Sequence, residues 1–156
     1  MSREQEGIKE EEVHGQTLLG IDYGEKFIGL SLFTVGRDPF PFLHGRIVVS
    51  QVADPKEEIK KIVEEEAVDI IILGLPHLTD GTESTMTLKV KKFGESLSAH
   101  LENMPLYFQD ETLSTYEAQE RMKSDPRFDF KVDLQKIDAL SAAIIIEQFL
   151  QEQVIK

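Results

Sequence analysis

The run at residues 68–73, which is apolar except for Asp69 and ends at Gly74 and Pro76, most constrains what this chain can fold into. Such a run is typical of a β-strand buried on both faces, because a strand with one solvated face alternates apolar and polar residues. Strands buried on both faces are usually parallel and lie at the centre of a sheet that helices cover on either side. The run therefore predicts an α/β fold with a central parallel strand.

Three further β-strands are expected ahead of this run. Residues 17–24, 27–34 and 43–50 are rich in apolar and β-branched residues, and a short glycine-containing turn separates the first two. These segments predict a three-stranded meander. Asp54 and Pro55 then begin a helix, because aspartate accepts hydrogen bonds from the free N–H groups of a first turn and proline has no N–H to satisfy.

The second half of the chain adds helices and one more strand. Helices are expected at residues 84–101, 114–123 and 133–151, a strand at residues 105–111, and a flexible loop at residues 125–131. Together with the meander, this succession predicts a ribonuclease-H-like mixed β-sheet flanked by helices, within the α/β class.

A chain of 156 residues is expected to form a single domain. We assign this domain to residues 17–152 and expect the Glu-rich residues 1–16 to be a disordered acidic tail. The sequence has no cysteine, which excludes disulfide bonds, thiol catalysis and thiolate metal sites, and which fits the reducing cytoplasm. No apolar run approaches membrane-spanning length, so we expect a soluble cytoplasmic protein.

The charge of the chain gives a mixed indication about nucleic-acid partners. A formal net charge of −12 argues against them, because lysine and arginine contacts to phosphate supply most non-specific affinity. The charge is unevenly distributed, however, and basic residues gather in two stretches. These are Lys89, Lys91 and Lys92, and then Lys123, Arg127, Lys131 and Lys136. The overall sign therefore does not decide the partner.

Asp22 stands inside the first apolar strand, immediately before a glycine turn. Aspartate is depleted from strands, and burying an ionised carboxylate without a partner is very costly. The position indicates a carboxylate kept at a strand end for a metal ion or a phosphate-bearing ligand. The simpler alternative is that Asp22 accepts hydrogen bonds from turn amides.

Four short segments, taken together, resemble one protein family over nearly the whole domain. They are Gly20-Ile21-Asp22-Tyr23-Gly24 with Lys26, Gly74-Leu75-Pro76 with residues 80–83, Asp110-Glu111 with residues 113–115, and Lys136-Ile137-Asp138 with Ser141-Ala142. In this order and spacing they resemble the RuvX/YqgF family, known as Holliday junction resolvases and as nucleases that mature the 5′ end of 16S ribosomal RNA. The resemblance implies the ribonuclease-H-like fold already predicted.

By this resemblance, Asp22, Glu111 and Asp138 are the catalytic residues and the ligands of a metal ion, Mg²⁺ or Mn²⁺. Hydrolysis of a phosphodiester makes the same demand, because it requires charge stabilisation and an activated water, which such an ion supplies. Two alternatives stay open. Asp110 could be the ligand in place of Glu111, since neighbouring strand residues point to opposite faces, and Asp138 could simply favour a helix N-terminus.

The resemblance also implies a substrate-binding set around the loop at residues 74–83. Backbone and hydroxyl groups there could donate to phosphate, as could a helix N-terminus and nearby lysines. The expected residues are Lys26, Gly81, Thr82, Lys89, Lys91 and Lys92. One departure from the family is Thr112, where relatives commonly have an arginine beside the acidic ligand.

The sequence thus predicts a metal-dependent endonuclease that processes the 5′ end of pre-16S ribosomal RNA. A Holliday junction resolvase acting on branched DNA is the first alternative, and a non-catalytic nucleic-acid-binding module is the second. An actin-like kinase has a similar first phosphate loop, but such enzymes need a second domain of the same kind. The protein is expected to be a monomer or a homodimer.

Overall fold

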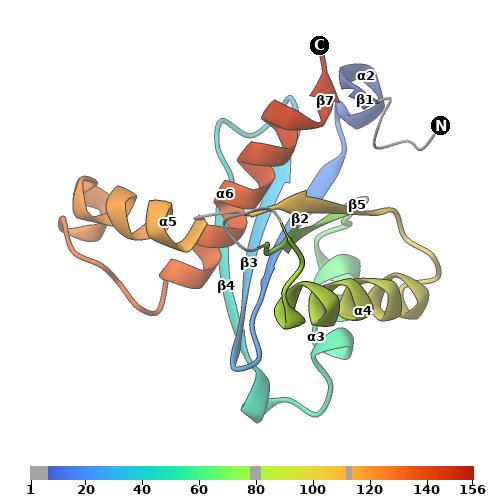
Figure 1. Cartoon of the computed structure of the whole chain (residues 1–156). Coiled ribbons are helices and arrows are strands. Elements are labelled where there is room, and N and C mark those ends of the chain that lie inside the picture. The colour runs from blue at the N-terminus through green and yellow to red at the C-terminus, as the bar shows by residue number, and fades with distance from the viewer. Residues whose placement is uncertain (1–6, 78–81, 112–113) are drawn as a thin grey trace.

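A five-stranded mixed β-sheet forms the centre of the computed structural model, which describes residues 7–77, 82–111 and 114–156 (Figure 1). The strands lie in the order β4-β3-β2-β5-β6. Their bounds are Thr17–Tyr23 for β2, Phe27–Thr34 for β3, Phe42–Val48 for β4, Ile70–Leu75 for β5 and Leu106–Asp110 for β6. The first three form the predicted antiparallel meander, and β5 and β6 run parallel to β2.

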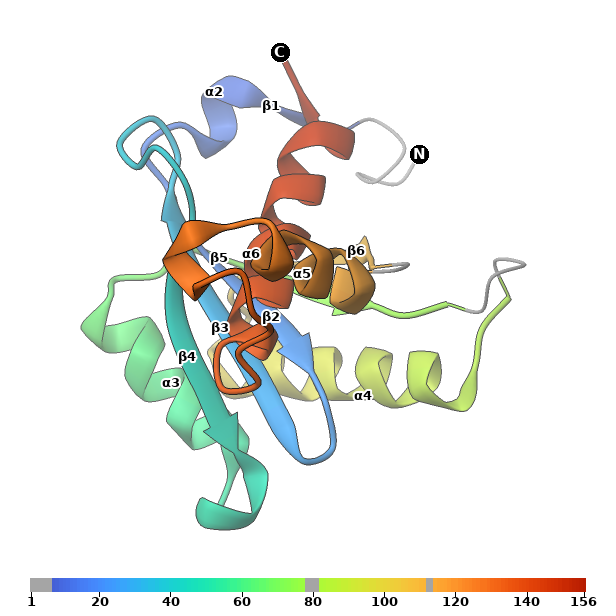
Figure 2. The same ribbon diagram turned by 90° about the vertical axis from the view of Figure 1, so that its left-hand side faces the viewer.

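Helices cover both faces of this sheet, as Figure 2 shows from the side. Helices α3 (Pro55–Glu65) and α4 (Thr85–His100) pack on one face. Helix α6 (Ile137–Glu152) packs on the other face, and α5 (Ser114–Lys123) lies against the outer side of α6. The architecture is the predicted ribonuclease-H-like sheet flanked by helices.

Strand β5 has all six residues buried, which confirms the fully buried parallel strand expected from the apolar run. Ile71 and Leu73 face the core formed with α3 and α4, whereas Ile72 faces the core formed with α6. The strand starts two residues later than expected because Val68 and Asp69 belong to the connection from α3. The N–H of Asp69 nevertheless bonds to the carbonyl of Thr17 (2.9 Å) and aligns β5 with β2.

The helix starts follow the capping residues of the sequence. The side chain of Asp54 accepts a hydrogen bond from the N–H of Lys56 (3.0 Å), with Pro55 at the first helical position, as predicted. Ser84 and Thr87 form a reciprocal capping box at the start of α4. These caps fix where each helix leaves the sheet edge.

Helix α6 comes unusually close to the sheet because glycines face it. A β-carbon on Gly20 would lie 2.6 Å from the carbonyl oxygen of Ala142, and one on Gly29 would overlap the carbonyl oxygen of Asp138. With α5 on its outer side, α6 has ten of its 16 residues buried. The helix is therefore held firmly against β2 and β3 along its length.

The structure differs from the sequence-based expectation at the N-terminus. Residues 8–16 were expected to belong to a disordered tail, but Ile8–Lys9 form strand β1 and Glu10–Val13 form the short helix α2. Strand β1 pairs in parallel with β7 (Val154–Ile155), so these two segments from opposite halves of the chain lie side by side, as Figure 1 shows. Ile8 and Val13 are buried beside the end of α6, and this apolar contact holds the segment. Residues 1–6 lie outside the described part.

The connection between α5 and α6 also differs in detail. It contains a short 3₁₀ helix, η2 (Pro126–Phe128), in which Asp125 accepts from the N–H of Arg127 (2.8 Å). Asp133 accepts from the N–H of Gln135 (2.9 Å) and so holds a separate turn, and α6 starts at Ile137, four residues later than expected. A second 3₁₀ turn, η1 (Val49–Gln51), follows β4. Within the described residues, no helix combines the length and apolarity needed to cross a membrane.

Candidate active site

Three elements bring the predicted acidic residues to one edge of the sheet. Strands β2, β5 and β6 run parallel, with Ile21 beside Leu73 and Gly74 beside Gln109, so their C-terminal ends lie together. Asp22 comes directly after Ile21 in β2, and its side chain lies on the face of the sheet that α6 covers. Glu111 comes directly after the last residue of β6.

Asp22 and Glu111 interact directly, and their environment favours the protonated forms. Burial raises the pKa of Asp22 to about 6; a hydrogen bond from Glu111 opposes this shift and the charge of Asp138 adds to it. Burial, followed by the charge of Asp22, raises the pKa of Glu111 to about 9. The hydrogen bond lowers one pKa and raises the other, so a protonated Glu111 donates to an ionised Asp22. The pair thus carries a single negative charge near neutral pH.

Gly74 provides the space in which Glu111 lies. A β-carbon on Gly74 would overlap the Oε2 atom of Glu111, so any larger residue would displace that carboxylate. The same Oε2 atom is buried and finds no hydrogen-bond donor among the described residues. A buried carboxyl oxygen without a hydrogen-bond partner is costly, and a cation that displaces the proton of Glu111 would relieve this cost.

Asp138 approaches the pair from the first turn of α6. Gly29 is the register partner of Asp22 in the β2–β3 pair, and the backbone of Asp138 lies against Gly29. The charge of Asp138 contributes to the raised pKa of Asp22, which shows that the two carboxylates are near each other. The glycine therefore lets the last helix bring its acid next to the acid of the first strand.

A cation from β4 completes the arrangement. Nη1 of Arg46 lies 3.5 Å from Oδ2 of Asp138 and donates to the carbonyl of Leu134 (3.2 Å). The guanidinium also stacks on the ring of Phe27, 4.0 Å from its centroid. Arg46 is one-quarter exposed, so it faces the outside beside the acidic residues.

The carboxylates lie close enough to interact, but they do not converge on one point. Among the residues that the structure describes, no three acidic or histidine side chains are placed as a ready metal-binding cluster. The reason is that the side chain of Asp138 pairs with Arg46, whereas Asp22 and Glu111 pair with each other. Carboxylate oxygens are nevertheless the ligands that Mg²⁺ and Mn²⁺ prefer.

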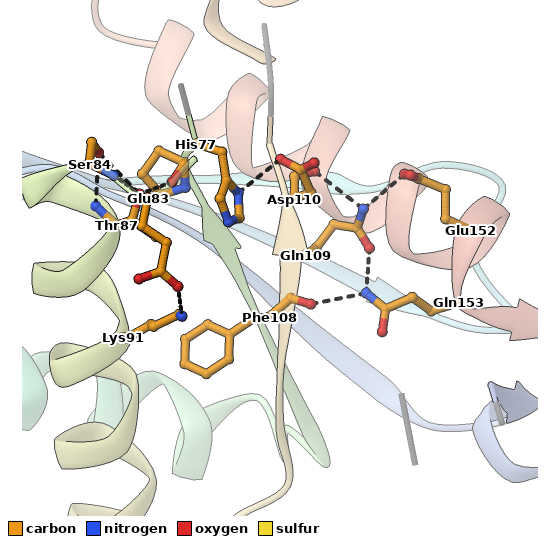
Figure 3. Close-up of polar contacts among 11 residues, drawn as sticks. His77, Glu83, Ser84, Thr87, Lys91, Phe108, Gln109, Asp110, Glu152 and Gln153 are labelled. Carbon is orange, nitrogen blue, oxygen red and sulfur yellow. Dashed lines mark hydrogen bonds and ion pairs between the residues drawn. The ribbon is translucent and has the colours of Figure 1, made fainter. Parts of the chain in front are cut away.

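The side chains of Asp110 and Glu111 point to opposite faces of the sheet. The sequence alone left open which of the two faces Asp22. Figure 3 shows Asp110 beside His77, whose Nδ1 lies 3.4 Å from Oδ1 of Asp110. The preceding residue, Gln109, points to the α6 face and donates to Glu152 (2.8 Å) while it accepts from Gln153 (2.6 Å). Because side chains alternate along β6, Glu111 shares the α6 face with Asp22 and Asp110 does not.

Five of the six residues predicted to bind substrate lie in the described part of the chain. Lys26 is exposed in the β2–β3 turn, and Thr82 and Lys92 are also exposed. Lys89 pairs with Glu25 (2.8 Å), and Lys91 pairs with Glu83, as Figure 3 shows for the latter. Lys89, Lys91 and Lys92 lie on α4, so they belong to the sheet face opposite α6. Gly81 and Thr112 lie outside the described residues.

Sequence reasoning missed Arg46 and the importance of Gly29 and Gly74. A single arginine in an edge strand gives no signal by itself, because its partner is 92 residues away. The glycines stood within or beside quoted motifs, but only the packing of α6 and the position of Glu111 show why each must lack a side chain.

The fold and the acidic edge define a class: the ribonuclease-H-like proteins that carry carboxylates across a mixed sheet. Comparison with known proteins is more specific. The model of the RuvX family, described as Holliday junction resolvase, matches residues 16–152, and the chain belongs to this family.

Curated relatives match along most of their length. One from Shewanella denitrificans is 33% identical over 141 residues, which cover 88% of this chain and 96% of the relative. One from Colwellia psychrerythraea is 34% identical over 142 residues, covering 88% and 91%. Both carry the name "Putative pre-16S rRNA nuclease".

Solved structures agree with the fold. Thermus thermophilus RuvC aligns with a TM-score of 0.51 at 13% identity, covering 87% of this chain and 95% of that one. The yeast mitochondrial Holliday junction resolvase Ydc2 aligns with a TM-score of 0.54 at 15% identity, covering 97% and 82%. These similarities confirm the predicted fold.

Proposed function

We propose that this protein is a metal-dependent endonuclease whose catalytic carboxylates are Asp22, Glu111 and Asp138. The observation that carries the proposal is the Asp22–Glu111 pair, in which two carboxyl groups are held together in a partly buried place at a cost to the fold. Raised carboxyl pKa values of this kind concentrate at functional sites, because stability alone would select against them. Membership of the RuvX family supports the same chemistry.

The residues present fit a hard divalent cation. Glu111 Oε2 is buried without a donor, and a cation would favour the ionised form of both carboxyl groups. Asp22 and Glu111 would hold the ion first, and Asp138 would join when its side chain turns from Arg46. When bound, Mg²⁺ or Mn²⁺ supplies charge stabilisation for the scissile phosphate and lowers the pKa of a water nucleophile.

The protein's own groups have two further tasks. The rigid sheet edge and α6 hold the carboxylates in place, so that little reorganisation is needed during the reaction. Arg46, which pairs with Asp138, offers a guanidinium that can instead bind a phosphate oxygen of the substrate. Lys26, Lys89, Lys91 and Lys92 would contact the phosphate backbone further along the strand, with Gly81 and Thr82 near the helix start.

The substrate we propose is the 5′ region of pre-16S ribosomal RNA, because the similar curated relatives carry that function in their name. This substrate would place the protein in the cytoplasm. A four-way DNA junction is the second candidate, favoured by the description of the matching family. Both substrates present phosphodiesters in structured nucleic acid, so the carboxylates serve either one equally well.

The proposal is tested by cleavage of a 5′-extended 16S RNA fragment and of a four-way DNA junction, each with Mg²⁺ or Mn²⁺. Wild type is compared with Asp22→Asn and Glu111→Gln, and Asp110→Asn is the matched control, since Asp110 faces away from the pair. We expect metal-dependent cleavage of the RNA that both site variants lose and the control keeps. The preferred substrate is the one with the larger kcat/KM at equal salt.

The other outcomes are equally clear. Cleavage that survives in Asp22→Asn would place the active site elsewhere. Binding without cleavage of either substrate by wild type would favour the non-catalytic binding module, and preferential cutting of the junction would reverse the order of the two substrates.

A further inference from the structure

An open cleft beside β4 is lined by aromatic rings and cations that the proposed catalytic site does not use. Its volume is about 430 Å³. We call it the aromatic cleft and define it by Phe40, Phe42, Arg127, Phe128 and Lys136. Figure 2 shows the connection between α5 and α6, which carries the last three residues, beside β4. Two segments far apart in sequence therefore build the cleft together.

Two phenylalanine side chains of this cleft are largely exposed to solvent. Phe40 is 59% exposed and Phe42 is 63% exposed, and both are large apolar side chains at the free edge of the sheet. Exposed phenylalanines gathered around one cleft mark a binding surface, because burial elsewhere would stabilise the fold more.

Cations lie over two rings of the cleft, those of Phe40 and Phe128. The guanidinium carbon of Arg127 is 5.6 Å from the ring centroid of Phe40 and 5.8 Å from that of Phe128. Nζ of Lys136 is also 5.8 Å from the Phe128 centroid. Asp125 holds the guanidinium of Arg127 in place with a 2.7 Å contact, so its position is fixed before any ligand arrives. Three of the four cation–ring contacts among the described residues are in this cleft, although the chain has a net charge of −12.

Two elements link the cleft to the acidic site. Lys136 lines the cleft and is the N-cap residue of α6, two positions before Asp138. On the sheet side, β4 carries Phe42 at its beginning and Arg46 beside Asp138. A ligand in the cleft and a phosphate at the carboxylates could therefore belong to one molecule.

We propose that the aromatic cleft binds a single-stranded segment of the nucleic-acid substrate, with bases stacked on Phe40 and Phe42 and phosphates near Arg127 and Lys136. Aromatic rings interleaved with cations are the surface on which unpaired strands bind, since every base has a face to stack and every linkage has a charge to pair. The inference rests on the proposed nuclease function and deepens it: the enzyme would recognise a single-stranded flank next to the cut. The cations favour a nucleic acid over an apolar protein segment.

Binding of a fluorescein-labelled 12-nucleotide single-stranded RNA, followed by anisotropy, tests this inference. All proteins carry Asp22→Asn, so that no cutting occurs, and thermal melting checks that each folds. The variants are Phe42→Ala, Phe42→Leu and Lys136→Gln, with Ile155→Ala as the control, because Ile155 is 52% exposed at the far end of α6.

We expect Phe42→Ala and Phe42→Leu to weaken binding about tenfold, since leucine keeps the apolar surface but has no ring for a base. Lys136→Gln should weaken binding and reduce the slope of log affinity against log salt by about 1. Ile155→Ala should bind like the parent. Wild-type RNA affinity in Phe42→Leu would show that no base stacks on this ring and would overturn the proposal, as would equal affinity in all variants or no binding by the parent.

A cleavage assay with Asp22 intact separates this proposal from the nuclease function. If wild type cuts its substrate and Phe42→Ala binds and cuts equally well, the cleft proposal fails alone. If wild type cuts nothing while Phe42→Ala loses RNA binding, the nuclease function fails and the cleft proposal stands.

Discussion

Asp138 and Gly29 are in backbone contact: the position of a β-carbon on Gly29 is taken by the carbonyl oxygen of Asp138. Gly29 is also the strand partner of Asp22. One glycine thus sets the approach of the last helix to the first strand, and with it the separation of two of the proposed catalytic carboxylates.

Gly29→Ala is expected to destabilise the protein and to impair cleavage. Because the added methyl group meets backbone and not a flexible side chain, α6 must shift, at a cost of about 1–3 kcal/mol. Urea denaturation measures the loss, and metal-dependent cleavage measures the displacement of Asp138. Unchanged stability together with unchanged cleavage would show that α6 does not depend on this contact.

Glu111→Gln should stabilise the metal-free protein at pH 8 while it abolishes cleavage. The pKa values of Asp22 and Glu111 rise on folding from ordinary values of 3.8 and 4.5 to about 6 and about 9, so the folded state binds more protons than the unfolded state. The free energy of unfolding therefore falls as pH rises through that window. Replacing Glu111 removes the larger of the two pKa shifts. We therefore expect the free energy of unfolding to rise by about 1–3 kcal/mol at pH 8.

This prediction is checked by measuring how the stability gain of Glu111→Gln depends on pH. Unfolding curves for wild type and Glu111→Gln should diverge at pH 8 and converge as the pH falls below the ordinary values of 3.8 and 4.5, where both carboxyl groups become protonated in either state. Asp110→Asn serves as the control for a lost negative charge at the neighbouring position. A larger gain for Asp110→Asn than for Glu111→Gln would contradict the assignment.

Mn²⁺ or Mg²⁺ should raise the melting temperature of wild type but not of Asp22→Asn or Glu111→Gln. An ion that binds only the folded state adds about 2.7 kcal/mol when its concentration is 100 times Kd. Thermal melting with and without EDTA gives this measurement without any substrate. Equal stabilisation of wild type and both variants would mean that the ion binds somewhere else.

Arg46→Ala should reduce cleavage on the order of tenfold, because a charge-assisted contact to phosphate is lost beside Asp138. Arg46→Lys should restore part of the activity, since lysine keeps the charge but not the planar stacking on Phe27. A lower kcat would show that the guanidinium acts during the reaction of bound substrate, whereas a higher KM alone would show that it contributes only to substrate binding. Full activity in Arg46→Ala would exclude a contact of Arg46 with the substrate phosphate and would leave only its pairing with Asp138.

The fold could be predicted from the sequence because its signals are local. The buried strand β5, the Asp54 and Ser84 caps and the meander each follow from a few neighbouring residues. The N-terminal residues 8–13 could not be predicted in the same way, because Ile8 and Val13 are held by contacts with the other end of the chain. The Glu-rich composition of this segment predicted disorder, although the segment contains two apolar side chains that are buried in the fold.

The candidate site could be predicted in its residues but not in its geometry. The motifs contained Asp22, Glu111 and Asp138, and alternation along β6 alone left Asp110 as a rival. The pairing of Asp22 with Glu111, the contact of Asp138 with Arg46 and the need for Gly74 depend on distances between elements that lie far apart in sequence. Those distances are set by sheet order and helix packing, which no local pattern specifies.

The proposed site joins the first long strand to the last helix, and this has a consequence for synthesis on the ribosome. Asp138 lies in α6, which also supplies one whole side of the hydrophobic core. A nascent chain that ends before α6 lacks Asp138 and leaves one face of the sheet uncovered. The order of translation would thus leave the proposed site unassembled until α6 has emerged from the ribosome.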